Sequence, residues 1–63
     1  MTGIQNFRLK KGMTQEELAD IVNVDRSSVA KWETGKSAPR ASLLPKVADA
    51  LGCTVDELLR ETA

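Results

Sequence analysis

The chain has 63 residues, nine cationic and nine acidic side chains, and 41% hydrophobic residues, which allows one small domain. No apolar run approaches the roughly 18 residues that span a bilayer, and no signal-peptide pattern follows Met1, so we expect a cytoplasmic protein without membrane association. With no His, one Cys and no glycine-rich phosphate loop, the composition argues against an enzyme, a metal site or a cofactor.

The charges are segregated along the chain although they sum to zero. Residues 1–13 carry only cations and residues 14–25 only carboxylates, whereas residues 26–46 carry five cations against Glu33. A molecule with zero net charge can therefore have a positively charged face that attracts nucleic acid. The alternative is that these charges merely solvate helix surfaces.

Capping boxes predict where three helices begin. In each, a Thr precedes by three residues a Glu or Gln that can reach back to it: Thr2 and Gln5, Thr14 and Glu17, Thr54 and Glu57. We expect a first helix over residues 2–11, stopped by Gly12. The second helix should turn the apolar positions after Thr14 toward the core, namely Leu18, Ala19, Ile21 and Val22.

A sharp turn is predicted at Asn23, because Asn enters the left-handed region at lower cost than most residues. Asp25 is then a suitable N-cap for a third helix with Val29 and Trp32 directed inward. The outward positions of that helix are Arg26, Ser27, Ala30 and Lys31.

Two further helices follow a cation-rich loop over residues 34–40. Pro45 fits only the first turn of the fourth helix, which predicts a cap at Ser42 or Leu44 and a stop at Gly52. Inward positions are expected at Val47, Ala48 and Leu51, then at Val55, Leu58 and Leu59 of the fifth helix. Residues 61–63 should fray. The prediction is one all-α domain of five short helices over residues 1–63.

The second and third helices form a geometric unit that suits DNA. Small Ala19 lets two helices approach closely, Asn23 redirects the chain, and the apolar residues around them hold residues 26–31 outward. The major groove is about 12 Å wide and admits one α-helix. Arg26 can fork onto guanine, whereas Lys31 can reach guanine as a point charge.

The sequence resembles the Cro and phage-repressor (XRE-like) helix-turn-helix family from about Ile4 to Leu59. The resemblance rests on these residues: Phe7-Arg8, Gly12-Met13-Thr14-Gln15-Glu16-Glu17-Leu18-Ala19, Val29, Trp32-Glu33-Thr34-Gly35-Lys36, Pro39 and Ala48-Asp49-Ala50-Leu51-Gly52. The family usually has Gly at the position of Asn23 and often Asn at that of Thr34. The resemblance implies a lambda-repressor-like fold with its helix-turn-helix at the second and third helices.

The resemblance also implies roles for individual residues. Those matching base-reading positions are Arg26, Ser27 and Lys31. Those matching phosphate-contacting positions are Gln15, Ser28, Thr34, Lys36 and Arg40. Gln15 would also support the reading helix, and Arg8 with Glu33 matches a buried ion pair.

Each role has a plainer alternative. Arg26 and Lys31 can simply solubilise a helix, and Gln15 can be an ordinary first-turn residue. Trp32 can stack on a base as in single-strand binders, although its spacing from Val29 favours the core. An exposed Arg8–Glu33 pair would contribute little.

The expected partner is double-stranded DNA with a palindromic operator, read by a homodimer whose half-sites lie roughly 34 Å apart. The resemblance implies a bacterial or phage-encoded transcriptional regulator, most simply a repressor, with no small-molecule effector. Its dimer surface would involve Leu43, Leu44, Val55 and Leu59, although these leucines can equally be ordinary core residues. The alternative is a protein-interaction module of the same fold, such as an antitoxin or adaptor, which the zero net charge favours.

Overall fold

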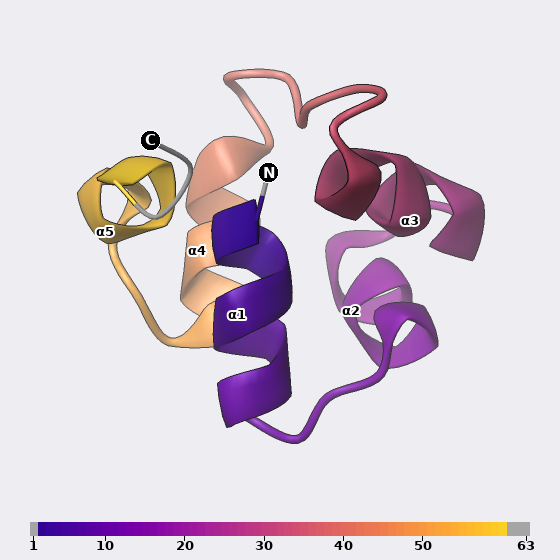
Figure 1. Ribbon diagram of the computed structural model, residues 1–63, viewed down its shortest axis with the longest axis horizontal. Coiled ribbons are helices and arrows are strands. Elements are labelled where there is room, and N and C mark those ends of the chain that lie inside the picture. Colours follow the sequence, from indigo (N-terminus) through magenta and orange to yellow (C-terminus); the bar gives the residue numbers. More distant parts are fainter. Residues whose placement is uncertain (1, 61–63) are drawn as a thin grey trace.

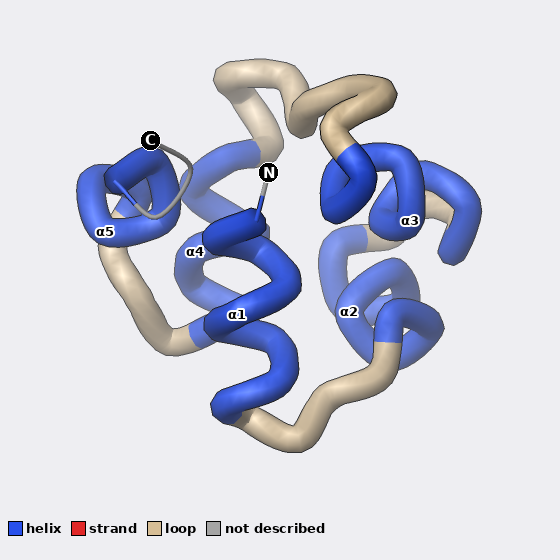
Figure 2. Tube along the Cα trace, in the orientation of Figure 1, coloured by secondary structure: helices blue, strands red, loops and turns tan. Residues whose placement is uncertain are grey.

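The protein folds into five short α-helices, seen in a computed structural model that describes residues 2–60 (Figure 1). They are α1 (Thr2–Lys10), α2 (Gln15–Val22), α3 (Arg26–Thr34), α4 (Leu44–Leu51) and α5 (Val55–Arg60). Residues 2–60 contain helices and connecting loops and no strand, as Figure 2 also shows. The predicted all-α fold of five helices is therefore confirmed.

Helix α1 lies at the centre of the arrangement and contacts α3, α4 and α5 (Figure 1). Helix α2 packs against α3 on one side and against α4. Ten buried hydrophobic residues from all five helices form one core: Ile4, Leu18, Ala19, Val22, Val29, Trp32, Val47, Ala48, Leu51 and Leu58. Because α2 and α3 share this core, the position of α3 is fixed by packing from beneath.

The helix ends follow the local sequence signals. In the capping box of α2, Thr14 Oγ1 accepts from the Glu17 amide at 3.0 Å, and Glu17 Oε1 accepts from the Thr14 amide at 2.8 Å. Thr54 and Glu57 make the same reciprocal bonds at α5. The side chain of Thr2, on which the expected box with Gln5 depends, lies outside what the structure describes, as do residues 61–63, where fraying is expected.

Two predicted helix boundaries are wrong in detail. The N-cap of α4 is Leu43, with a right-handed backbone and no side-chain cap, instead of Ser42 or Leu44. A turn over residues 41–43 already has near-helical geometry, so the chain enters α4 without needing a polar cap. The predicted N-cap of α3 is confirmed at Asp25, which has an extended backbone, although its side chain makes no capping hydrogen bond. Helix α1 ends one residue early, at Lys10.

Two residues expected in the core lie at the surface. Ile21 is 58% exposed and Leu59 is 47% exposed. Successive helical residues are rotated by about 100°. Leu18, Ala19 and Val22 define the buried stripe of α2, and Ile21 falls outside it. Leu59 is likewise rotated away from buried Leu58.

Candidate nucleic-acid interface

The turn between α2 and α3 is built on a left-handed residue. Asn23 has φ 61° and ψ 51°, and its amide donates to the carbonyl of Ala19, as does the amide of Val24 at 2.9 Å. Asp25 then returns to an extended conformation before α3 begins. The chain reverses direction within three residues. Because Ala19 is small and buried, the two helices pack directly against each other.

Helix α3 has a buried face and an exposed face. Val29 and Trp32 are 0% and 5% exposed. The opposite face carries four exposed residues: Arg26, Ser27, Lys31 and Thr34. The three residues matched to base-reading positions therefore lie at the surface of one helix. Within residues 2–60, the side chains of Arg26 and Lys31 have no ion pair or hydrogen bond.

The other residues matched to DNA contacts are distributed around this helix. Gln15 begins α2, and Ser28 is half-buried in the first turn of α3. Lys36 and Arg40 are exposed in the loop that follows α3, whereas Pro39 between them is buried. The hydroxyl of Thr34 donates to the carbonyl of Lys31 at 3.3 Å, so it already has an acceptor within its own helix.

A buried ion pair anchors α3 from below. Arg8 Nε lies 2.6 Å from Glu33 Oε2, and Arg8 Nη2 donates to Glu33 Oε1 at 3.0 Å. Arg8 and Glu33 are only 7% and 8% exposed. Gln15 Nε2 also donates to Glu33 Oε1 at 3.0 Å, and Arg8 Nη1 donates to the Met13 carbonyl at 2.7 Å. The carboxylate thus links α3 to α1 and to the start of α2.

Burial and hydrogen bonding shift the pKa values of both members of this pair. Burial acts to raise the pKa of Glu33, but hydrogen bonds from Arg8 and Gln15 and the charge of Arg8 outweigh it. The pKa of Glu33 is therefore lowered, and the hydrogen bond to Glu33 raises the pKa of Arg8. Both groups are charged at neutral pH, as a bidentate arginine–carboxylate pair requires.

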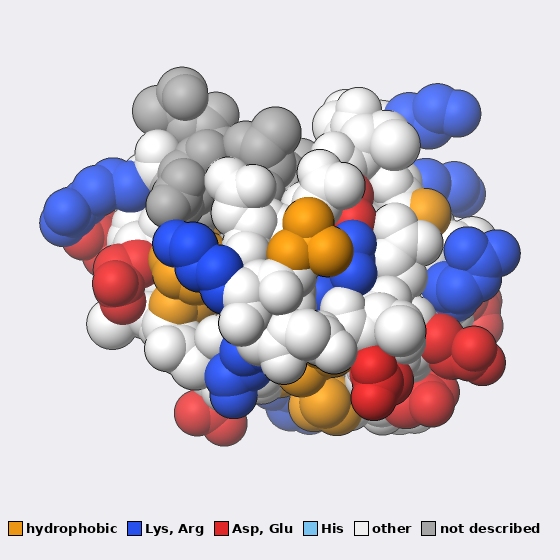
Figure 3. Space-filling view, turned by 60° about the horizontal axis from the view of Figure 1, so that its bottom comes forward, with side chains coloured by type: hydrophobic (Ala, Val, Ile, Leu, Met, Phe, Trp, Pro, Cys, Tyr) orange, Lys and Arg blue, Asp and Glu red, His pale blue; other side chains and the backbone are white. Residues whose placement is uncertain are grey.

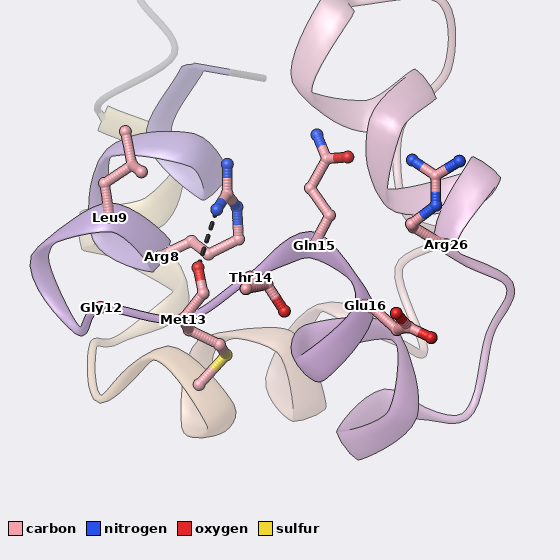
Figure 4. A pocket seen from close by; sticks show the side chains of 8 residues that line it. All are labelled: Arg8, Leu9, Gly12, Met13, Thr14, Gln15, Glu16 and Arg26. Atoms are coloured by element: carbon pink, nitrogen blue, oxygen red, sulfur yellow. Dashed lines mark hydrogen bonds between the residues drawn. The ribbon is translucent and has the colours of Figure 1, made fainter.

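An open hollow of about 590 Å³ joins the end of α1, the start of α2 and the first residue of α3 (Figure 4). Eight residues line it: Arg8, Leu9, Gly12, Met13, Thr14, Gln15, Glu16 and Arg26. Gln15 and Arg26 thus face one depression although they come from different helices. The packing of α2 against α3 brings them together, which local spacing alone does not predict.

The exposed charge of residues 26–46 is entirely positive. Glu33 is the one carboxylate in this stretch, and it is buried against Arg8. The five cations are all exposed: Arg26, Lys31, Lys36, Arg40 and Lys46. On the side of the molecule that holds α2 and α3, Lys and Arg side chains gather toward one edge, and a group of Asp and Glu side chains adjoins them (Figure 3). A neutral chain therefore presents local positive potential beside α3.

Two contacts of this site were not anticipated from the sequence. Arg8 donates to the backbone carbonyl of Met13, and the Gln15 amide donates to Glu33. A carbonyl acceptor has no signature in residue type. The bond from Gln15 to Glu33 joins residues 18 positions apart, so only the packing of α2 against α3 reveals it.

Helices α2 and α3 are joined at a left-handed turn, and α3 is exposed along one side and packed against the core along the other. This arrangement defines a helix-turn-helix unit. Residues 4–58 match the helix-turn-helix family model. The chain therefore belongs to this helix-turn-helix family, of the XRE type.

Similar proteins include several transcription regulators. The chain is 39% identical over 56 residues to the transcriptional activator BcrR of Enterococcus faecalis, covering 89% of this chain and 28% of BcrR. It is 36% identical to the cryptic phage CTXphi repressor RstR of Vibrio cholerae, covering 87% and 49%. The chain therefore spans less than a third of the length of BcrR and about half of the length of RstR.

A solved structure supports the same fold. The clp gene regulator ClgR of Corynebacterium glutamicum superposes with a TM-score of 0.89 at 33% identity, covering 95% of this chain and 64% of that one.

Among residues 2–60, no helix has the length and apolar character needed to cross a membrane.

Proposed function

We propose that this chain binds double-stranded DNA as a transcriptional regulator of repressor type and reads its operator from the major groove with α3. One observation carries the proposal: α3 buries Val29 and Trp32 while Arg26, Ser27 and Lys31 stand exposed on its other side. Outward polar side chains on a protruding helix are what base-edge recognition requires. Both RstR, a repressor, and BcrR, an activator, carry related sequence.

The proposed contacts divide into base reading and backbone positioning. Arg26 forks onto O6 and N7 of a guanine, a contact that discriminates by about 1–3 kcal/mol in good geometry. Ser27 and Lys31 follow it along the exposed face. Among the proposed phosphate contacts, Thr34 lies at the end of that face and the others surround it: Gln15, Ser28, Lys36 and Arg40.

The test is selection of bound duplexes from a random pool, repeated with Arg26→Ala. We expect a symmetric consensus that loses information chiefly at one base pair per half-site in the variant. Lys10→Ala is the matched control, because it removes a cation from the exposed surface of α1 and should leave the consensus unchanged. An unchanged consensus for Arg26→Ala would remove Arg26 from the reading role.

We propose that two copies bind together around a twofold axis, through the surface formed by α4 and α5. Leu59 is 47% exposed there, and half-buried Leu43, Leu44 and Val55 pack at the edge of the core. Sedimentation of Leu59→Glu bound to a palindromic duplex should show a lower proportion of the two-copy complex. Leu9→Glu is the matched control, since Leu9 is 59% exposed on α1. Equal effects of both variants would contradict this surface.

A protein-interaction module of the same fold is the second candidate, favoured by the zero net charge. A salt titration separates the two functions, because each phosphate that a Lys or Arg neutralises adds about 0.9 to the slope of log affinity against log salt on duplex DNA. Of the five proposed phosphate contacts, only Lys36 and Arg40 are cationic, so they predict a slope of about 1.8 for each bound copy. Affinity for duplex that does not change with salt would favour the protein-interaction module.

A further inference from the structure

A second hollow, of about 300 Å³, lies away from the Arg8–Gln15 depression. It is formed by the end of α2, the turn after it, the loop before α4 and the first turns of α4. Seven residues line it: Val22, Asn23, Val24, Arg40, Ser42, Leu43 and Lys46. Two distant segments, residues 22–24 and 40–46, meet here because α2 packs against α4.

The charge on this hollow is positive and uncompensated. Arg40 and Lys46 both line it and are exposed, and no carboxylate is among the lining residues. Within residues 2–60, neither cation has an ion pair, whereas Arg8 and Arg60 each have an acidic partner. Two cations that face one depression repel each other, and an anion between them would remove that repulsion.

Polar side chains complete the hollow. Asn23 and Ser42 line it, and neither makes a side-chain hydrogen bond within the described part of the chain. The left-handed backbone of Asn23 fixes the point at the end of α2 from which its side-chain amide extends. An amide and a hydroxyl beside two cations are donors suited to the oxygens of a phosphate.

We propose that this hollow seats one phosphate group, held by Arg40 and Lys46 together with Asn23 and Ser42. The phosphate comes either from the DNA backbone or from a small phosphorylated molecule. The first source rests on the proposed function and adds Lys46, Asn23 and Ser42 to the DNA contacts. The second source does not depend on DNA binding.

The first experiment titrates the free protein with inorganic phosphate against chloride at constant ionic strength, followed by amide NMR shifts. We expect saturable shifts at residues 22–24, 42–44 and 46, since Pro45 has no amide proton. Lys46→Gln should abolish them, whereas Lys10→Gln, which removes a cation outside the hollow, should keep them. Circular dichroism checks that both variants remain folded, as expected for exposed positions.

The second experiment measures the salt dependence of affinity for duplex DNA. If a backbone phosphate occupies the hollow, Lys46→Gln should reduce the log–log slope by about 0.9, and Lys10→Gln should not. Phosphate shifts without a change of slope would support the small phosphorylated molecule. No saturable shifts together with an unchanged slope would overturn the site, whether or not the protein binds DNA.

A wild-type protein with no affinity for any duplex would refute the proposed function alone. In that case the phosphate titration still decides the site: saturable shifts that Lys46→Gln abolishes support it, and their absence overturns it.

Discussion

Removing the carboxylate of Glu33 is the most direct test of how α3 is held. In Glu33→Ala, the buried Arg8 guanidinium loses two acceptors and keeps only the Met13 carbonyl, and the Gln15 amide loses its acceptor. Breaking a buried pair by removing one partner costs about 3–5 kcal/mol, because the remaining charge is left uncompensated.

This loss is large relative to the free energy of unfolding of the whole protein. At about 0.05–0.15 kcal/mol per residue, a chain of this size is stabilised by only about 3–9 kcal/mol. Since 1 kcal/mol shifts the melting temperature of such a small domain by roughly 4–8 °C, Glu33→Ala should lower it by roughly 12–40 °C. Glu16→Ala is the matched control, because Glu16 is exposed at the start of α2 and its loss should cost about 1 kcal/mol at most.

The assay is thermal and urea denaturation, followed by circular dichroism and by the fluorescence of buried Trp32. If Glu33→Ala does not fold, the double variant Arg8→Met with Glu33→Met keeps the reasoning testable. It leaves no stranded charge, so it should be more stable than either single variant. Equal melting temperatures for Glu33→Ala and Glu16→Ala would refute the account of the pair.

Three further predictions concern pH, capping and the turn. The pKa of Glu33 is lower in the folded protein than in the unfolded chain, so the unfolded chain binds more protons in acid. The free energy of unfolding should therefore fall as the pH drops below about 4.3. Urea denaturation at several pH values should show a smaller fall for Glu33→Gln. Thr14→Ala removes a capping box and should cost about 1 kcal/mol in the same assay, whereas Thr34→Ala should cost less because its hydroxyl only bonds the exposed end of its own helix. At φ 61°, Asn23→Gly should keep or raise the melting temperature and Asn23→Val should lower it by the equivalent of about 1–2 kcal/mol; the reverse order would contradict the role of the left-handed turn.

The helices were predictable because their signals are local. Capping boxes at Thr14 and Thr54 act within three residues, and the positive φ of Asn23 follows from its own conformational preference. The buried stripe of α3 follows from the spacing of Val29 and Trp32. Local patterns therefore predicted the order of the elements and the exposed face of α3.

Features that depend on which segments meet in space were not predictable in this way. The surface position of Ile21 depends on where α3 and α4 cover α2, and the start of α4 depends on a turn without a polar signature. The bond from Gln15 to Glu33 and the hollow shared by Asn23 and Lys46 join distant parts of the chain. Spacing along the sequence carries no information on these contacts.

The same ion pair that stabilises α3 also shapes the charge that DNA would meet. Glu33 is the one carboxylate between residues 26 and 46, and an exposed carboxylate there would repel phosphates and compete for Arg26 or Lys31. Burial against Arg8 removes it from the surface and supplies a counter-charge from α1. The remaining acidic residues of residues 14–25 precede α3, so the positive side chains of α3 and the loop after it are left without acidic neighbours in their own segment. Net charge is therefore a poor guide to DNA binding in this chain, because the balance of nine against nine is reached by separating the charges.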